Sequence, residues 1–356
     1  MTATQDQPTR KKVLGLPFDG VLLVIVGGLL AVGLMMVYSA TFDWSYQQYH
    51  NQNTIFLLQL RSLVIGLVAM FIAARLDYHW WRYLALAAMG GALVMLIWVL
   101  LRGAVTFGAQ RSIINGSVQP SELAKFATVV YLAVWLSSKG DKLHQLGYGL
   151  VPFGLIIGVV TALILMQPDI SAAATVVFVA VIMFFVAGAD VVQMILAGAI
   201  GSAAAWAVLQ VSTTGRTRLV EYVTGLQNIM QAPWQVKQAA IAFVNGGIFG
   251  QGLGESYQKF GFLPTPHTDS IFAVIGEELG LVGCLVVIAL FVALAWRGFK
   301  IASEAHDNLG AILAAGMVSW VGLEALINIA VMVGAMPVAG NALPFISYGG
   351  SNLVVT

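Results

Sequence analysis

Long apolar stretches separated by short polar ones dominate this chain. A helix needs about 20 mostly apolar residues to cross a hydrocarbon core of roughly 30 Å. The pattern predicts membrane helices over 18–40, 54–75, 81–101, 120–137, 150–167, 170–188, 190–211, 270–296 and 309–334, and a further one over 345–356. The last stretch is too short to cross, because a helix rises only about 1.5 Å per residue. The predicted fold is therefore all-α, a polytopic membrane protein of about ten transmembrane helices with the last one incomplete.

One long segment, 212–268, separates the seventh apolar stretch from the eighth and is predicted to be a large extracytoplasmic loop. Within it, residues 234–249 form an amphipathic pattern that is expected to lie along the membrane interface. The sequence contains no soluble domain, heptad run or convincing internal repeat. We therefore expect a single integral-membrane domain over 1–356, which begins with a cytoplasmic tail, 1–17.

The positions of Lys and Arg in short loops predict the orientation of the bundle. The loops on the N-terminal side hold most of them: Arg10, Lys11, Lys12, Arg75, Arg82, Lys139, Lys142, Arg297 and Lys300. The short loops on the other side hold Arg102 and Arg111. The N-terminus is thus expected in the cytoplasm. The first apolar stretch has no small-residue cleavage site and is interpreted as a retained anchor.

Composition supports the membrane assignment and narrows the chemistry. The chain is 59% hydrophobic and 9% charged, whereas soluble domains carry about 25% charged residues. Its net charge of +1 gives no indication of a nucleic-acid partner. The single cysteine, Cys284, lies in an apolar run and is expected to be a small core residue. A Walker loop, a dinucleotide fingerprint, a metal-binding His pair and a G-x-S-x-G elbow are all missing from the sequence. Any chemistry would therefore rest on carboxylates and cations.

The strongest candidate for that chemistry is Asp269, at the start of the eighth apolar stretch. Ionisable groups at membrane depth indicate function by default. Asp269 could instead cap the helix, and the two roles are compatible. Glu277 and Glu278 follow about two turns later, and Gly276 and Gly280 have the small-xxx-small spacing that packs neighbouring helices. This context favours a structural role for the two glutamates.

Two further constellations contain charges near the ends of predicted helices. Glu122 and Lys125 are three residues apart and share a helix face, so they could pair or line a groove. Arg216 and Arg218 open the long segment 212–268, where arginine forks could bind diphosphate oxygens or simply snorkel to the interface. Both interpretations remain open for each pair.

The remaining polar motifs interrupt apolar runs. Residues 167–169, Gln-Pro-Asp, could be a broken helix that lines a cavity or a tight turn. Residues 344–352 contain two glycines with Ser and Tyr, typical of a close backbone approach or an unwound turn. Glu324 and Asn328, four apart, form a polar stripe expected to face the bundle.

Together, the blocks 119–125, 167–169, 252–259, 267–280 and 344–351 resemble the SEDS family (shape, elongation, division and sporulation), whose main branches are FtsW and RodA. The resemblance runs over nearly the whole chain, with the blocks in family order. Residues 252–260 are more similar to the FtsW branch. Ser270, Ile170, Ser171 and Asn352 depart from the usual family pattern, but none of them removes an expected acid or base.

The resemblance implies a peptidoglycan glycosyltransferase that polymerises lipid II outside the bacterial cytoplasmic membrane and releases undecaprenyl diphosphate. It implies a class B penicillin-binding protein as partner, with other divisome or elongasome membrane proteins. Asp269 would be the catalytic carboxylate, and Glu122 and Lys125 would line a central cavity. The predicted substrate-binding set is Glu122, Lys125, Arg216, Arg218, Lys259, His267, Ser347 and Ser351. No cofactor is required by the sequence, although a divalent cation, Mg²⁺ or Mn²⁺, could share the phosphate charge.

Two other functions would use a similar charged cavity. A lipid II flippase would be expected to show inverted repeats and cavity charges through the full depth of the membrane. A noncatalytic scaffold that activates a partner synthase would not need Asp269. Most of the candidate polar and charged groups gather at the predicted outer face, and the enzyme is the favoured function.

Overall fold

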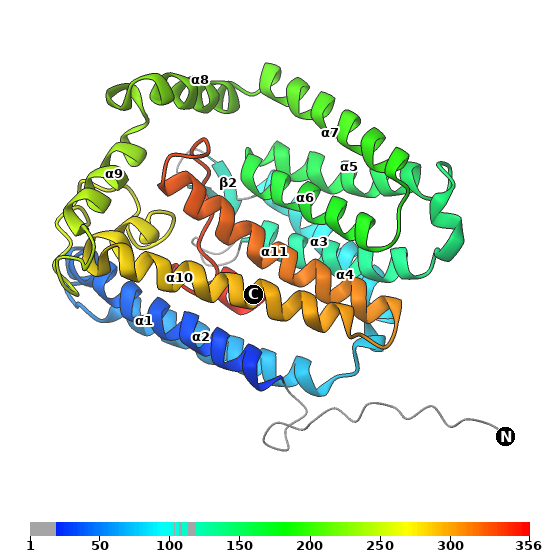
Figure 1. Cartoon of the computed structure of the whole chain (residues 1–356), viewed down its shortest axis with the longest axis horizontal. Coiled ribbons are helices and arrows are strands. Elements are labelled where there is room, and N and C mark those ends of the chain that lie inside the picture. Colours follow the sequence, from blue (N-terminus) through cyan, green and yellow to red (C-terminus); the bar gives the residue numbers. More distant parts are fainter. Residues whose placement is uncertain (1–18, 103, 107–108, 113–118) are drawn as a thin grey trace.

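The computed structural model describes residues 19–102, 104–106, 109–112 and 119–356, and it is almost entirely helical (Figure 1). The predicted tail, 1–17, lies outside the described residues. The helices are α1 (Gly20–Tyr49), α2 (Thr54–Arg75), α3 (Trp81–Arg102), α4 (Pro120–Ser137), α5 (Leu150–Met166), α6 (Ile170–Val186), α7 (Val191–Val211), α8 (Thr213–Gln227), α9 (Trp234–Gly246), α10 (Ile271–Ser303), α11 (Asn308–Met332) and α12 (Gly350–Val355). Two short antiparallel strands, β1 (Ala104–Thr106) and β2 (Ala109–Ser112), follow α3.

Each predicted apolar stretch forms a helix, but the number of clear membrane spans is smaller than about ten. Among the described residues, six helices are long and apolar enough to cross a bilayer: α1, α2, α3, α7, α10 and α11. The apolar helices α5 and α6 have 17 residues each, which gives about 26 Å, slightly less than the hydrocarbon core. Helix α4 has 18 residues but includes Glu122 and Lys125. Helix α12 has six residues.

The segment 212–268 is not one long loop, which corrects the prediction. It contains α8 and α9, joined through a short 3-10 turn at Ile229–Gln231. Ser212 begins α8, because its side-chain oxygen accepts a hydrogen bond from the Gly215 amide at 3.1 Å. The predicted amphipathic helix is α9, which buries Val236, Ala239 and Ala242 on one face. In Figure 1, α8 and α9 cross one end of the bundle between α7 and α10.

That end, where α1, α3, α5 and α11 finish and α10 begins, is called the Asp269 end below. The opposite one, where α11 begins, is called the Asp307 end, because Asp307 caps α11. There the Tyr78 hydroxyl donates to Asp307 at 2.8 Å, and the Arg297 guanidinium binds both carboxylate oxygens of Asp19. These contacts join the helix hairpins at the Asp307 end.

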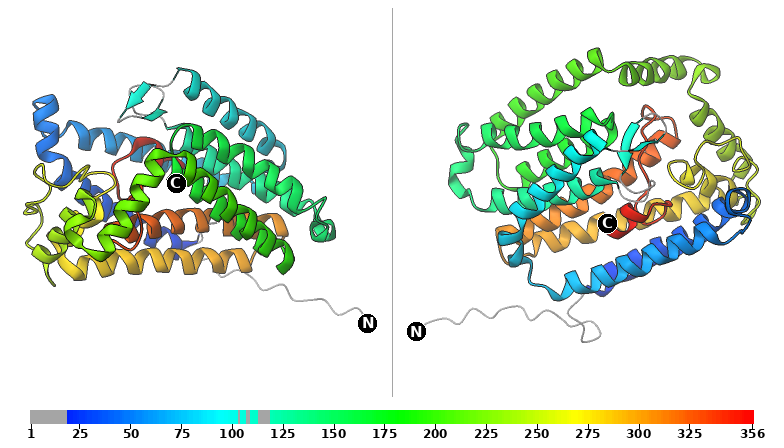
Figure 2. Two further views of the ribbon diagram at one scale, coloured as in Figure 1. Left: turned by 90° about the horizontal axis from the view of Figure 1, so that it is seen from above. Right: turned by 180° about the vertical axis from the view of Figure 1, so that it is seen from behind.

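Helix α11 is shared by the two apolar cores of the bundle. The first core packs Leu309, Ile312 and Trp320 of α11 against α3, α4, α5 and α6. The second packs Val321, Ala325 and other α11 residues against α1, α9 and α10. Helix α12 returns to lie against α2 and α4 (Figure 2). A polar side chain on α11 is therefore enclosed by protein on both sides.

Helix α10 is interrupted at Gly280, whose φ of 68° lies in the left-handed region. At this break the chain that follows α9 crosses the helix closely. The carbonyls of Glu277 and Glu278 accept hydrogen bonds from the amides of Gln251 and Gly252 at 2.9 and 3.1 Å. Beyond the break, the Leu281 amide donates to the Gly247 carbonyl at 2.9 Å. The interruption thus exchanges helical hydrogen bonds for bonds to the crossing loop, which explains why glycine occupies position 280.

Candidate active site

The backbone that carries Asp269 is held by three hydrogen bonds from distant parts of the chain. The carbonyl of His267 accepts from the Tyr348 amide at 2.8 Å, and that of Thr268 accepts from the Ser347 hydroxyl at 2.7 Å. The carbonyl of Asp269 itself accepts from the Asn328 side-chain amide at 2.8 Å. These bonds reach the main chain and hold the segment that carries Asp269 in one position.

Asp269 is not the cap of α10. The N-cap position belongs to Ser270, whose hydroxyl donates to the Pro264 carbonyl at 2.7 Å and accepts from Gln235 at 2.9 Å. Asp269 lies one residue before the cap and is half-buried. Of the two roles considered for this carboxylate, capping is therefore wrong, and catalysis remains the prediction.

The two glutamates that follow Asp269 fasten the crossing loop to α10. Both are buried at 1% exposure. The Glu277 carboxylate accepts from Asn245, from the Ser256 hydroxyl and from the Gln258 amide. These bonds agree with the structural role favoured by the sequence.

Lys259 is tied to the second glutamate. Its ammonium lies 2.8 Å from the Glu278 carboxylate and also donates to the Ser39 hydroxyl and the Gly254 carbonyl, at 2.9 and 2.7 Å. The Lys259 side chain is 6% exposed. An ammonium has three protons to donate, and these contacts occupy that capacity. A contact between Lys259 and the substrate remains a prediction. Such a contact would compete with the bonds from Lys259 to Glu278, Ser39 and Gly254.

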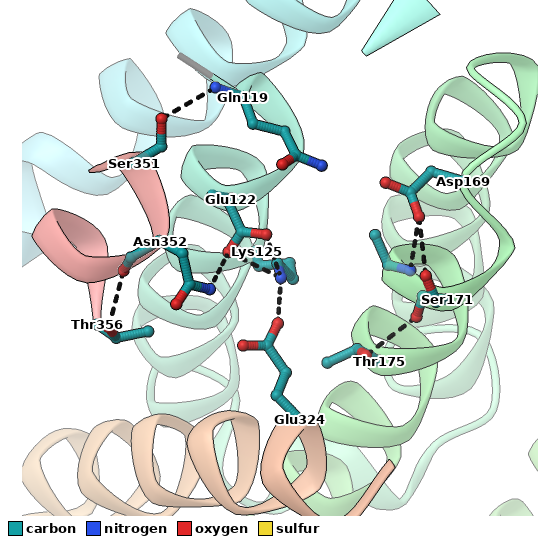
Figure 3. A network of polar contacts seen from close by, with 11 residues as sticks. Gln119, Glu122, Lys125, Asp169, Ser171, Thr175, Glu324, Ser351, Asn352 and Thr356 are labelled. Atoms are coloured by element: carbon teal, nitrogen blue, oxygen red, sulfur yellow. Dashed lines mark hydrogen bonds and ion pairs between the residues drawn. The ribbon is translucent and has the colours of Figure 1, made fainter. Parts of the chain in front are cut away.

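A second polar cluster lies deeper in the bundle (Figure 3). The Lys125 ammonium is 2.8 Å from the Glu122 carboxylate, which confirms that this pair forms. It also contacts the Glu324 carboxylate from α11, and Glu122 in turn accepts from the Asn352 side chain at 3.1 Å. We call Glu122, Lys125 and Glu324 the triad. All three side chains are at most 10% exposed, so two carboxylates share one cation in a setting of low dielectric.

The triad and the Asp269 segment are connected through α11. Glu324 contacts the triad lysine and Asn328 contacts Asp269, and both are 1% exposed, as the predicted polar stripe requires. Four residues along a helix correspond to about 6 Å. The two constellations are therefore about one turn apart, although their members come from segments far apart in the sequence.

The space next to the triad is small in this structure. Lys125, Thr128, Thr175 and Trp320 line a cavity of about 10 Å³, which is room for about one water molecule. Lys125 lines this cavity, and the expectation that Glu122 and Lys125 line a central cavity for the substrate stays a prediction. Ser351 lies near the same region, where its hydroxyl accepts from the Gln119 amide at 3.1 Å.

The two arginines lie on α8, beside a larger apolar groove. Arg216 is exposed and Arg218 is half-buried. Arg218 is four residues before Tyr222 and eight before Leu226, so the three share one helix face. The groove, of about 480 Å³, is lined by Tyr222, Gly225, Leu226, Ile229, Ala232, Pro233, Val236, Ala240, Phe243, Met332, Val333, Gly334, Met336 and Val338. An arginine thus lies on the face of α8 that continues into an apolar groove.

Residues 167–169 form a tight turn between α5 and α6. The Asp169 carboxylate accepts from the Ala172 amide at 3.1 Å and from the Ser171 hydroxyl at 3.0 Å, and thereby caps α6 (Figure 3). Of the two interpretations of this motif, the turn is the observed one. In the part of the chain that the structure describes, no group of three or more His, Cys, Asp or Glu residues could hold a metal ion. A role for Mg²⁺ or Mn²⁺ stays a prediction.

His267 is neutral at physiological pH, because burial lowers its pKa to about 4. Its ring stacks on Trp44 with a centroid distance of 4.5 Å and approaches Tyr348 edge-on at 5.9 Å. Its Nδ1 atom is buried without a hydrogen-bond partner among the described residues. Protonation would place an uncompensated charge in this aromatic contact.

Acidification is therefore expected to destabilise the protein through His267. The ordinary pKa of 6.5 lies above the folded value of about 4, so the unfolded chain binds the proton first. This contribution to stability is complete above pH 6.5 and is lost as the pH falls toward 4. In thermal unfolding of the detergent-purified protein, His267→Phe, which keeps an aromatic ring there, should lose less stability than the wild type over this range. Parallel losses in both proteins would contradict the buried, neutral imidazole.

Comparison with known proteins places the whole described bundle in one family. Residues 20–356 match the family of cell cycle proteins FtsW, RodA and SpoVE. A protein of Geobacter metallireducens named probable peptidoglycan glycosyltransferase FtsW is 37% identical over 95% of this chain and 92% of its own. The stage V sporulation protein E of Bacillus subtilis is 36% identical over 95% of this chain and 93% of its own.

Solved structures agree with the sequence comparison. A chain from a peptidoglycan synthase complex that coordinates polymerisation and crosslinking has a TM-score of 0.76 at 25% identity, covering 96% of this chain and 95% of its own. The rod shape determining protein RodA of Thermus thermophilus has a TM-score of 0.69 at 25% identity, covering 96% and 93%. The chain therefore belongs to the SEDS family, the FtsW, RodA and SpoVE proteins.

Proposed function

We propose that this chain is a peptidoglycan glycosyltransferase that polymerises lipid II at the outer face of the bacterial cytoplasmic membrane. The relatives named as probable FtsW glycosyltransferases support this function and the FtsW branch. The observation that carries the proposal is the fixed backbone of residues 267–269, because three hydrogen bonds to main-chain carbonyls hold the segment that carries Asp269 in one position.

In the proposed reaction Asp269 is the general base. Its carboxylate takes the proton from the 4-hydroxyl of the acceptor N-acetylglucosamine as that oxygen attacks the anomeric carbon of the donor N-acetylmuramic acid. The new O4–C1 bond forms as the C1–oxygen bond to the diphosphate breaks, which inverts the centre from α to β. Undecaprenyl diphosphate leaves with the bonding electron pair, and a positioned base of this kind contributes about 10²–10⁴-fold to the rate.

Positive charge is needed where the diphosphate departs. Arg216 and Arg218, at the start of α8, are the proposed partners of the diphosphate, with Lys125 as a further candidate. The apolar groove along the same helix supports a substrate that joins an anionic group to a long hydrocarbon chain. A bound Mg²⁺ or Mn²⁺ would share the diphosphate charge, and the steps above do not depend on it.

The proposed orientation places the N-terminus and the Asp307 end in the cytoplasm and the Asp269 end outside. A class B penicillin-binding protein is the proposed partner. This rests on the likeness to a chain from a complex that coordinates polymerisation and crosslinking. Other divisome or elongasome membrane proteins would complete the assembly.

The proposal is tested by adding lipid II to the purified protein, with and without a class B penicillin-binding protein, and separating the products on a gel. Glycan polymer from the protein is expected. A parallel assay measures lipid II translocation in vesicles that contain the protein alone. Translocation without polymer would replace the enzyme with a flippase. Polymer only from the partner, unaffected by Asp269 variants, would make this chain a scaffold.

A further inference from the structure

Trp44 lies in the last two turns of α1, beside the segment that carries Asp269. With 30 residues, α1 is about 45 Å long, while the hydrocarbon core measures roughly 30 Å. Its final turns therefore extend past the core. The polar pair Asp43 and Gln47, hydrogen-bonded at 2.7 Å, lies in the same turns. Trp44 is thus at a depth where a water-soluble sugar can reach it.

One face of the Trp44 indole is already occupied. The imidazole of His267 lies parallel to it, at an interplanar angle of 15° and a centroid distance of 4.5 Å. Trp44 nevertheless remains 39% exposed. Because a parallel stack covers one face of the ring, a ligand would meet Trp44 on the other face. A tryptophan that only anchors a helix at the membrane interface needs no such support.

The His267 residue that stacks on Trp44 is itself held in place. The His267 carbonyl accepts from the Tyr348 amide at 2.8 Å, and the Tyr348 ring meets the imidazole edge-on. Asp269 is two residues further along the same segment, held by Asn328. The Trp44 indole of α1 thus stacks on the same short, fixed stretch of backbone that carries the candidate catalytic carboxylate.

We propose that the exposed face of Trp44 binds the terminal β-linked N-acetylglucosamine ring of the acceptor glycan. This proposal rests on the proposed function and assigns the acceptor a contact. A β-pyranose with equatorial substituents presents axial C–H bonds on each face, and these carry partial positive charge. The face of an aromatic ring is electron-rich, so the two surfaces attract. Trp44 is then a binding residue that holds the acceptor next to the segment of Asp269.

Two measurements test whether Trp44 binds the acceptor sugar. The first is the rate of polymerisation against lipid II concentration for Trp44→Leu and Trp44→Phe, with Trp206→Leu, an exposed tryptophan of α7, as the matched control. The stacking contact exists in both the ground and transition states, so Trp44→Leu should raise KM about tenfold and change kcat by less than about twofold. Trp44→Phe keeps a smaller ring and should raise KM about threefold. Trp206→Leu should leave both constants unchanged.

The second measurement does not depend on activity. Saturation-transfer NMR with the β-1,4-linked trimer of N-acetylglucosamine is recorded on protein that carries Asp269→Asn. Signal transfer to the sugar C–H protons should fall strongly when Trp44→Leu is added and remain when Trp206→Leu is added.

Unchanged KM and unchanged saturation transfer in Trp44→Leu would overturn the proposal that Trp44 binds the acceptor sugar and would leave Trp44 as an interfacial anchor. If Trp44→Leu does not fold, Trp44→Phe decides in the same way. If the wild type makes no polymer, the proposed function fails, and the NMR measurement alone decides whether Trp44 binds sugar.

Discussion

Asp269→Asn should abolish glycan polymerisation, with a loss of at least about 100-fold, while the protein still folds. The loss is expected because asparagine cannot accept the acceptor proton, and a general base contributes about 10²–10⁴-fold. Folding should survive because asparagine has nearly the same shape as aspartate, and because the bonds from Tyr348, Ser347 and Asn328 to the carbonyls of residues 267–269 are kept. The measurement is polymer formed per minute from lipid II, together with the melting temperature of the variant.

A matched control separates loss of the base from loss of a carboxylate in general. Asp43 lies at the same end of the bundle and accepts a hydrogen bond from Gln47 at 2.7 Å in an exposed position. Asp43→Asn is an equally small change and should retain activity within about twofold, as surface substitutions do. Wild-type rates from Asp269→Asn would show that the base is another group, and Glu122 would be tested next.

Lys125→Met should destabilise the bundle by about 3–5 kcal/mol, because it leaves buried carboxylates without their cation. Glu122 and Glu324 both contact the Lys125 ammonium, and their side chains are 10% and 2% exposed. Methionine matches the length of the lysine stem but supplies no charge. The expected result is a large drop in the midpoint of thermal unfolding and a low yield of folded protein.

Glu324→Gln is the matched control within the triad. It removes one carboxylate and leaves Glu122 and Lys125, 2.8 Å apart, as a pair of opposite charges. Its cost should be well below that of Lys125→Met, because no buried charge loses its partner. Equal costs for the two variants would mean that Lys125 does not compensate both carboxylates.

The contacts that could be predicted from the sequence are those between near neighbours. Glu122 and Lys125 pair because residues three apart in a helix share a face. The turn at Asp169 follows from the helix-capping habit of aspartate. The buried face of α9 follows from its amphipathic spacing. Each of these depends on fewer than about a dozen consecutive residues.

The contacts that could not be predicted join segments far apart in the chain. The sequence placed Glu324 and Asn328 on a polar stripe but did not give their partners, Lys125 and the Asp269 carbonyl. Lys259 was expected at the substrate, whereas the fold pairs it with Glu278. The sequence does not predict helix α8, because its residues lack an apolar run and are typical of a loop.

The sequence by itself determined which segments are apolar helices, where the polar motifs interrupt them and which family the chain resembles. It could do so because transfer into a hydrocarbon core depends on the composition of about 20 consecutive residues. Only the tertiary structure decided how those helices face one another. Lipid and a neighbouring helix are almost equally apolar, so hydropathy does not encode which side of a helix meets which partner. Packing decided the partners of Lys125, the ion pair between Lys259 and Glu278, and the bonds that hold the Asp269 backbone. Each of these contacts requires the helices to meet in one register.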